Sequence, residues 1–132
     1  FVIRTAGNLL SDMELGSIEY AVEHLGVKTI LVMGHEECGA IKALLSEESF
    51  HGHIKTIIDS LKQENEIQYA ISHHNLPYAI KANVVHQVSS LKRLFSQNKE
   101  SKEEKDVTVN GVVYSLDDGR VLPLETFKPI PN

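Results

Sequence analysis

A run of aliphatic residues at positions 28–33 constrains the fold of this chain more than any other feature. The run reads KTILVM and is followed at once by GHEECGA. Aliphatic residues without polar alternation are typical of a strand covered on both faces, as in a parallel sheet. The pattern predicts a buried strand whose carboxyl end carries a histidine and a cysteine into the next loop.

The residues before this strand predict a βαβ unit. Residues 1–3 have the apolar composition of a short strand, and Ser11 and Glu14 have the spacing of a helix capping box. Gly26 then follows the last apolar residue of that helix, where glycine commonly ends helices. We therefore expect residues 1–3 and 29–33 to be adjacent strands. In such units, functional loops lie at the carboxyl ends of the strands.

Helical periodicity predicts three more helices after the strand. Apolar residues recur every three or four positions in segments that run from Cys38 to about Glu47, from Ile54 to Leu61, and from Val84 to Phe95. Residues 96–106 carry mixed charge and predict a solvated loop.

The C-terminal segment VTVNGVVYSLDDGRVLPL predicts strands joined by a tight turn. Asp118-Gly119 is the expected hairpin turn, with Asn110-Gly111 as an alternative. Altogether we expect an α/β fold with a mostly parallel central sheet of about four strands. Helices should flank this sheet, and a C-terminal strand should lie at its edge.

Length and composition narrow the classes of function. A chain of 132 residues is expected to form a single domain over residues 1–132. Its net charge of −5 offers no basic face to nucleic acid or anionic lipid. No apolar run approaches the roughly 20 residues that a transmembrane helix requires. The one cysteine cannot form an internal disulfide, so a reducing compartment, the cytoplasm, is expected.

The N-terminus predicts an incomplete chain. Phe1 already belongs to a strand-like run, and neither an initiator methionine nor a signal-peptide pattern precedes it. We therefore expect the natural protein to have a further N-terminal segment. An organellar location would require a transit peptide in that segment.

His35 and Cys38 are the candidate metal ligands. Zinc favours imidazole nitrogen and thiolate sulfur, and two ligands separated by two residues can reach one ion from a turn that enters a helix. Gly34 and Gly39 flank the pair and allow the backbone to turn tightly. The spacing alone leaves open the alternative that Cys38 is an ordinary buried apolar residue. Of the other histidines, four are predicted to be solvated, namely His51, His53, His73 and His74; His86 is predicted to be an ordinary partly buried helical residue, and His24 to lie near a helix C-terminus.

Four segments occur in the order found in β-class carbonic anhydrases, and the chain resembles this family from Phe1 to about Leu122. They are FVIRTAGN, SIEYAVEHLGVKTILVMGHEECGAIKA, ANVVHQVSSLK and VNGVVYSLDDGRV. The resemblance is most specific in GHEECGAIKA. It implies that His35 and Cys38 bind a catalytic Zn²⁺ and that the protein hydrates carbon dioxide reversibly to bicarbonate. It also implies a homodimer or a higher oligomer, since family members place their active sites at a subunit boundary.

The chain departs from the family pattern in one respect. The family's other zinc-bound cysteine lies in a C-x-D-S-R motif upstream of the strand that matches residues 1–4, and this motif also supplies a catalytic aspartate and arginine. None of these residues is present here. We expect them upstream of Phe1, so the chain by itself should be inactive. Two alternatives remain open: a catalytically silent, zinc-poor dimerisation module, and a hydrolase of carbon disulfide or carbonyl sulfide on the same fold.

Three further residues are weaker site candidates. Gly39, beside the ligand pair, is a candidate for substrate binding. Val84 could wall an apolar carbon dioxide pocket, although an ordinary place in the core is its commoner role. Arg4 lies where one branch of the family binds inhibitory bicarbonate, and its guanidinium suits such anions. That branch also uses a tryptophan, which this chain lacks, so a structural ion pair is the alternative for Arg4.

Overall fold

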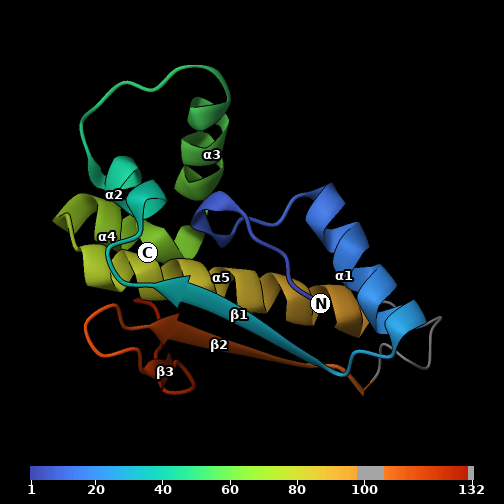
Figure 1. Cartoon of the computed structure of the whole chain (residues 1–132). Coiled ribbons are helices and arrows are strands. Elements are labelled where there is room, and N and C mark those ends of the chain that lie inside the picture. Colours follow the sequence, from blue (N-terminus) through green and yellow to red (C-terminus); the bar gives the residue numbers. More distant parts are fainter. Residues whose placement is uncertain (98–105, 131–132) are drawn as a thin grey trace.

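A computed structural model of the chain describes residues 1–97 and 106–130 (Figure 1). The elements follow the order η1 (Ala6–Asn8), α1 (Asp12–Leu25), β1 (Thr29–His35), α2 (Gly39–Leu45), α3 (Gly52–Lys62), η2 (Asn65–Ile67), α4 (Gln68–His73), α5 (Leu76–Gln97), β2 (Thr108–Tyr114) and β3 (Val121–Pro123). The α/β class is as expected. Within the described ranges, no helix is long and apolar enough to cross a membrane.

The described residues form one sheet of three strands in the order β1-β2-β3. β1 and β2 are parallel, with pairing that runs from Thr29 opposite Thr108 to His35 opposite Tyr114. β3 pairs antiparallel to β2 and forms the C-terminal edge strand. The sheet therefore has three strands in these residues, with one parallel and one antiparallel pair, instead of about four mostly parallel strands.

The turn between β2 and β3 lies at the expected place. Gly119 has a φ of 72°, a left-handed conformation that glycine adopts without steric cost. The alternative turn at Asn110-Gly111 is not used, because both residues lie inside β2. Most of the predicted loop at residues 96–106 lies outside the described residues.

The predicted first strand is not formed. Residues 1–3 belong to no strand, and the side chains of Phe1 and Val2 are 70% and 78% exposed. A strand requires a neighbour that pairs with its backbone N–H and C=O groups. Among the described residues β1 pairs with β2 alone, so residues 1–3 are not hydrogen-bonded to β1.

Helix α1 begins and ends where the sequence predicts. Ser11 and Glu14 form the capping box, in which the Ser11 backbone N–H donates to the Glu14 carboxylate at 2.9 Å. Gly26 ends the helix with a φ of 70°. The predicted helices around Ile54–Leu61 and Val84–Phe95 correspond to α3 and α5.

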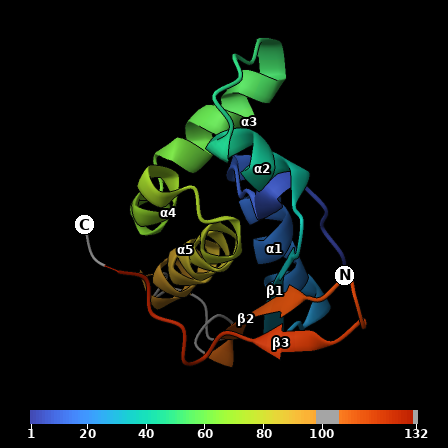
Figure 2. The same cartoon turned by 90° about the vertical axis from the view of Figure 1, so that its left-hand side faces the viewer.

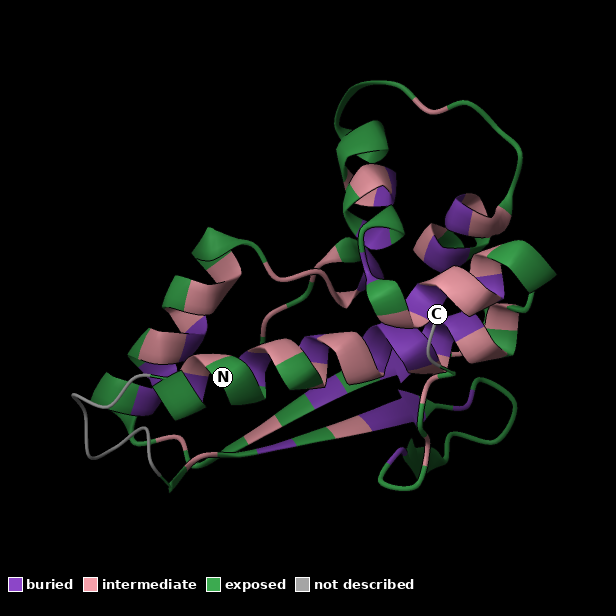
Figure 3. Cartoon of the chain, turned by 180° about the vertical axis from the view of Figure 1, so that it is seen from behind, coloured by how far each residue is buried: buried purple, intermediate pink, exposed green. Residues whose placement is uncertain are grey.

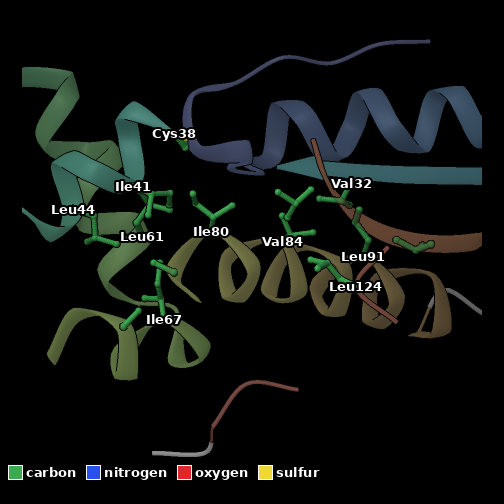
Figure 4. Close-up of a cluster of buried hydrophobic side chains, with 14 of the residues drawn as sticks. Val32, Cys38, Ile41, Leu44, Leu61, Ile67, Ile80, Val84, Leu91 and Leu124 are labelled. Atoms are coloured by element: carbon green, nitrogen blue, oxygen red, sulfur yellow. The ribbon is translucent and has the colours of Figure 1, made fainter. Parts of the chain in front are cut away.

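Helix α5 lies close against one face of the sheet (Figures 1 and 2). Two glycines permit this approach. A Cβ atom on Gly34 in β1 would lie 2.6 Å from Val84 Cγ2, and one on Gly111 in β2 would lie 2.9 Å from Val84 Cγ1. Val84 is fully buried, and Figure 4 shows it between α5 and the strands. The core continues from this contact into α2 and α3 through Ile41 and Leu61.

The second face of the sheet is largely exposed, which corrects the expectation of a strand covered on both faces. Along β1 the buried Val32 and Gly34 alternate with exposed residues, a pattern visible in Figure 3. Because side chains alternate along a strand and neighbouring strands are in register, the exposed apolar residues gather on one surface. We call this surface the open sheet face; its members are Leu31, Met33, Tyr114 and Val121, which are 51%, 44%, 37% and 45% exposed.

Candidate metal centre

The structure places His35 and Cys38 in one turn at the carboxyl end of β1. His35 is the last residue of the strand, and Cys38 is the N-cap of α2. Between them, Glu37 has a φ of 57°, a left-handed conformation that is uncommon for a residue other than glycine. The pair therefore lies where a strand ends and a helix begins, as the sequence predicts.

The imidazole of His35 is oriented by its own turn. Its Nδ1 atom lies 2.7 Å from the backbone oxygen of Glu36. A carbonyl oxygen only accepts hydrogen bonds, so Nδ1 is the protonated nitrogen in this contact. Nε2 then keeps its lone pair on an exposed side chain. Histidines that ligate metals commonly have this arrangement, with the second nitrogen donating to a carbonyl or carboxylate.

Cys38 lies at the border between the turn and the core. Its side chain is 6% exposed and belongs to the same apolar cluster as Ile41 and Leu61 (Figure 4). Structural cysteines are also buried, so burial by itself does not distinguish a ligand from a core residue. The nitrogen and sulfur donors of His35 and Cys38 together have the chemistry that zinc prefers.

The described residues do not complete a zinc site. Among them, no group of three or more histidine, cysteine, aspartate or glutamate side chains could hold a metal ion. His51, His53, His73 and His74 are exposed, as predicted. His86 is partly buried on α5, as predicted, and pairs with Glu66 on η2, with 2.7 Å between Nδ1 and Oε2. The residues present therefore fit two of the three protein positions of a catalytic zinc.

A contact with the β2–β3 hairpin anchors the turn formed by residues 35–38, which we call the metal turn for its two candidate ligands. The Glu36 backbone N–H donates to the backbone carbonyl oxygen of Tyr114 at 3.0 Å. Its carboxylate Oε2 accepts from the Ser115 hydroxyl at 3.1 Å and from the Leu116 N–H at 3.0 Å. Sequence reasoning missed Glu36, because these partners are about 80 positions away and no local pattern marks them.

Comparison with known proteins identifies the family. The family model described as carbonic anhydrase matches residues 1–121. A solved β-carbonic anhydrase of Coccomyxa, in complex with acetazolamide, is 30% identical with a TM-score of 0.77, and it covers all of this chain and 63% of its own. The chain belongs to the β-carbonic anhydrase family.

Other relatives agree on this family and on the extent of the match. Carbonic anhydrase 2 of Mycobacterium tuberculosis is 31% identical over 126 residues, which are 92% of this chain and 61% of the relative. A tetrameric β-carbonic anhydrase of Sordaria macrospora is 25% identical with a TM-score of 0.69, covering 95% of this chain and 68% of its own. This β-carbonic anhydrase chain thus spans less than two thirds of the mycobacterial relative.

The weaker candidates are separated in this carbonic anhydrase fold. Gly39 is exposed at the start of α2, and a Cβ there would meet no atom within 4 Å. Val84 is buried between two glycines of the sheet, which is the ordinary core role. Arg4 is exposed and forms no ion pair with any described residue, so the expected structural ion pair is not seen in this part of the chain.

A second polar feature of this carbonic anhydrase chain also escaped sequence reasoning. A cavity of about 530 Å³ lies between the start of α1, the end of α3 and α5, and Glu64 is one of its lining residues. Glu64 is 2% exposed, and its Oε2 atom has no hydrogen-bond partner among the residues that the structure describes. Burial raises the pKa of Glu64 to about 8; the Glu66 charge adds to this rise, and a hydrogen bond from Gln87 opposes it.

Proposed function

We propose that this chain is part of a zinc-dependent enzyme that hydrates carbon dioxide reversibly to bicarbonate, with His35 and Cys38 as two of the zinc ligands. Family membership over residues 1–121 supports the reaction. The observation that carries the metal assignment is the turn itself, in which the imidazole has one nitrogen engaged and the other available.

The chain's own residues would hold and orient the metal. His35 contributes Nε2, and the Glu36 carbonyl fixes the direction of the ring. Cys38 contributes its sulfur from the side of the core, so the ligand turn is attached to a rigid apolar cluster. When zinc is bound, it lowers the pKa of its water from 15.7 to about 7, so that hydroxide is available at neutral pH.

The ligand count sets what these residues can do without help. Catalytic zinc requires three protein ligands, and the described residues provide two. The sequence holds no second cysteine. We propose that the third ligand, and the aspartate and arginine of the C-x-D-S-R motif, come from residues outside this chain. The 132 residues alone should therefore bind zinc weakly and should not hydrate carbon dioxide.

Zinc binding and hydration test this proposal together. Titration of the chain with Zn²⁺ should reveal weak binding that Cys38→Ser and His35→Ala each reduce, since each removes one of only two ligands. His51→Ala alters an exposed histidine and serves as the matched control. A longer natural form that carries C-x-D-S-R should contain stoichiometric zinc and be active in stopped-flow hydration. Its Cys38→Ser variant should lose more than about 100-fold in zinc affinity. This is a larger loss than is usual when the changed residue only forms a hydrogen bond to a metal ligand.

Two results would contradict the proposal. Stoichiometric zinc and full hydration activity in the 132-residue chain would refute the ligand count. A longer form that keeps its zinc after Cys38→Ser would refute the role of Cys38.

We also propose that the protein assembles as a homodimer or a higher oligomer. The open sheet face supports this, because four exposed apolar residues lie on one surface there. His35 lies on the same surface of β1, since it alternates with the buried Gly34. A partner seated on this face would place the metal turn at the subunit boundary.

A further inference from the structure

The metal turn and the β2–β3 hairpin separate immediately after the last paired residues of the sheet. His35 and Tyr114 are the final pair of the β1–β2 register. Beyond this pair, the segment after β1 turns into α2, and the segment after β2 turns back into β3. Glu36 is the residue at which the two paths remain joined, because both its backbone and its side chain bond to the hairpin.

The hairpin side of this joint is itself firmly held. Ser115 is 6% exposed, and its backbone N–H donates to the Arg120 oxygen at 2.8 Å. The Gly119 N–H donates back to the backbone carbonyl oxygen of Ser115 at 3.0 Å. The Glu36 carboxylate therefore binds to a braced turn, in which the serine hydroxyl and the next amide both donate to one carboxylate oxygen.

The turn side of the joint controls the imidazole. The peptide unit after Glu36 presents the oxygen that accepts from His35 Nδ1, and the left-handed φ of Glu37 follows directly. Because that conformation is costly outside glycine, the surrounding contacts must hold it in place. Glu37 pairs with Lys42 on α2, whereas Glu36 attaches the same peptide unit to the sheet.

We propose that Glu36 is a positioning residue for His35. Its carboxylate is held by Ser115 and Leu116 and fixes the position of the Glu36 carbonyl. This carbonyl keeps the imidazole hydrogen on Nδ1, so that the lone pair of Nε2 is available to a metal. The significance of this for metal binding rests on the proposed function. The effect on the ring itself can be measured without a metal.

The imidazole tautomer of His35 is the direct readout. Nitrogen-15 NMR of the metal-free chain at alkaline pH, where the ring carries one proton, distinguishes Nδ1–H from Nε2–H. The wild-type chain should show mainly Nδ1–H. Glu36→Ala removes both carboxylate bonds and should give a mixture of the two tautomers. Glu36→Gln keeps an oxygen that can accept from Ser115 and Leu116, so it should restore the wild-type spectrum.

Two further variants separate positioning from general loosening of the turn. Ser115→Ala removes one of the two donors and leaves the turn sequence intact, so it should shift the tautomer part of the way. It also supplies the comparison if Glu36→Ala does not fold. Glu37→Ala changes the neighbouring acid, whose partner is Lys42, and is the matched control that should leave the tautomer unchanged.

The proposal is wrong if His35 keeps its Nδ1 hydrogen in Glu36→Ala and Ser115→Ala, or if Glu36→Gln changes the ring as much as alanine does. An equal change in Glu37→Ala would overturn it as well. Zinc titration gives a second readout, in which Glu36→Ala should weaken binding about tenfold or more. A wild-type chain that binds no zinc would count against the proposed function, while the tautomer would still decide the role of Glu36.

Discussion

Glu64 is a carboxyl group placed where its charge is costly. It is 2% exposed, one of its oxygens has no hydrogen-bond partner within residues 1–97 and 106–130, and the other accepts from Gln87 at 2.8 Å. Gln87 also donates to Asn83, which in turn donates to the Gly7 oxygen at 2.7 Å. The carboxyl group therefore ends a buried chain of hydrogen bonds that joins α5 to the N-terminal turn. With a pKa of about 8, it is neutral in the folded protein at pH 7.

This raised pKa makes stability depend on pH. Between pH 4.5 and about 8, the folded state binds a proton that the unfolded state has lost, so the free energy of unfolding should fall as pH rises. The total loss should be a few kcal/mol, with a slope of at most about 1.4 kcal/mol per pH unit. Glu64→Gln should remove this slope. Urea denaturation at several pH values measures it, and Glu48→Gln, an exposed glutamate, is the control. Parallel pH profiles of wild type and Glu64→Gln would contradict the prediction.

At the scale of elements, the contact between α5 and the sheet depends on what two glycines lack. Val84 fills the space that Cβ atoms on Gly34 and Gly111 would need. Gly34→Ala should therefore overpack this contact and lower the free energy of unfolding by roughly 1–3 kcal/mol. Val84→Ala should cost a similar amount, because it leaves a cavity.

Combining the two changes gives the sharper prediction. In Gly34→Ala/Val84→Ala, the methyl group that would clash with the new Cβ is gone, so the double variant should be more stable than the sum of the single effects. A coupling of about 0.5–3 kcal/mol is expected from chemical denaturation. Gly16→Ala, whose Cβ would meet no atom within 4 Å, is the control and should not destabilise the chain. Additive single effects would refute the direct contact.

The elements also differ in how well sequence predicts them. The Ser11–Glu14 box and the Asp118-Gly119 turn involve residues a few positions apart, so their local patterns were sufficient. The strand predicted at residues 1–3 was wrong, because a strand depends on a partner that local composition does not reveal. The same holds for β1, whose aliphatic run does not say which surface, if any, covers Leu31 and Met33.

The candidate site follows the same division. The pair of His35 and Cys38 was predictable as candidate ligands, since both residue types occur within four consecutive positions of one turn. Glu36 was not, because its partners come from a hairpin about 80 positions further along the chain. Glu64 was missed because it lies in a stretch of polar residues, QENE, and polar composition is typical of a solvated segment.

At the scale of the whole molecule, the sheet has one covered face and one open face. α5 packs against the first, and no described helix covers the apolar members of the second (Figures 1 and 2). His35 on β1 is in register with the exposed Tyr114 on β2, and Tyr114 is in register with the exposed Val121 on β3, so the exposed apolar residues extend from Leu31 and Met33 across the strands. A second copy placed here would bury these residues and the ligand turn that begins at His35.

Leu31→Asp tests this assembly. Leu31 is 51% exposed, so aspartate should be tolerated in an isolated chain, yet it would place a charge in the proposed interface. Sedimentation velocity should show a dimer or larger species for the wild type and a shift to monomer for Leu31→Asp.

Ile54→Asp is the matched control, since Ile54 is 57% exposed on α3, away from the sheet, and should leave the assembly unchanged. A monomeric wild-type chain would contradict the proposed assembly, and an oligomer that survives Leu31→Asp would assign the interface to another surface. If the open sheet face is the interface, Leu31→Asp should also expose His35 to modification by diethyl pyrocarbonate, because loss of the partner uncovers the turn.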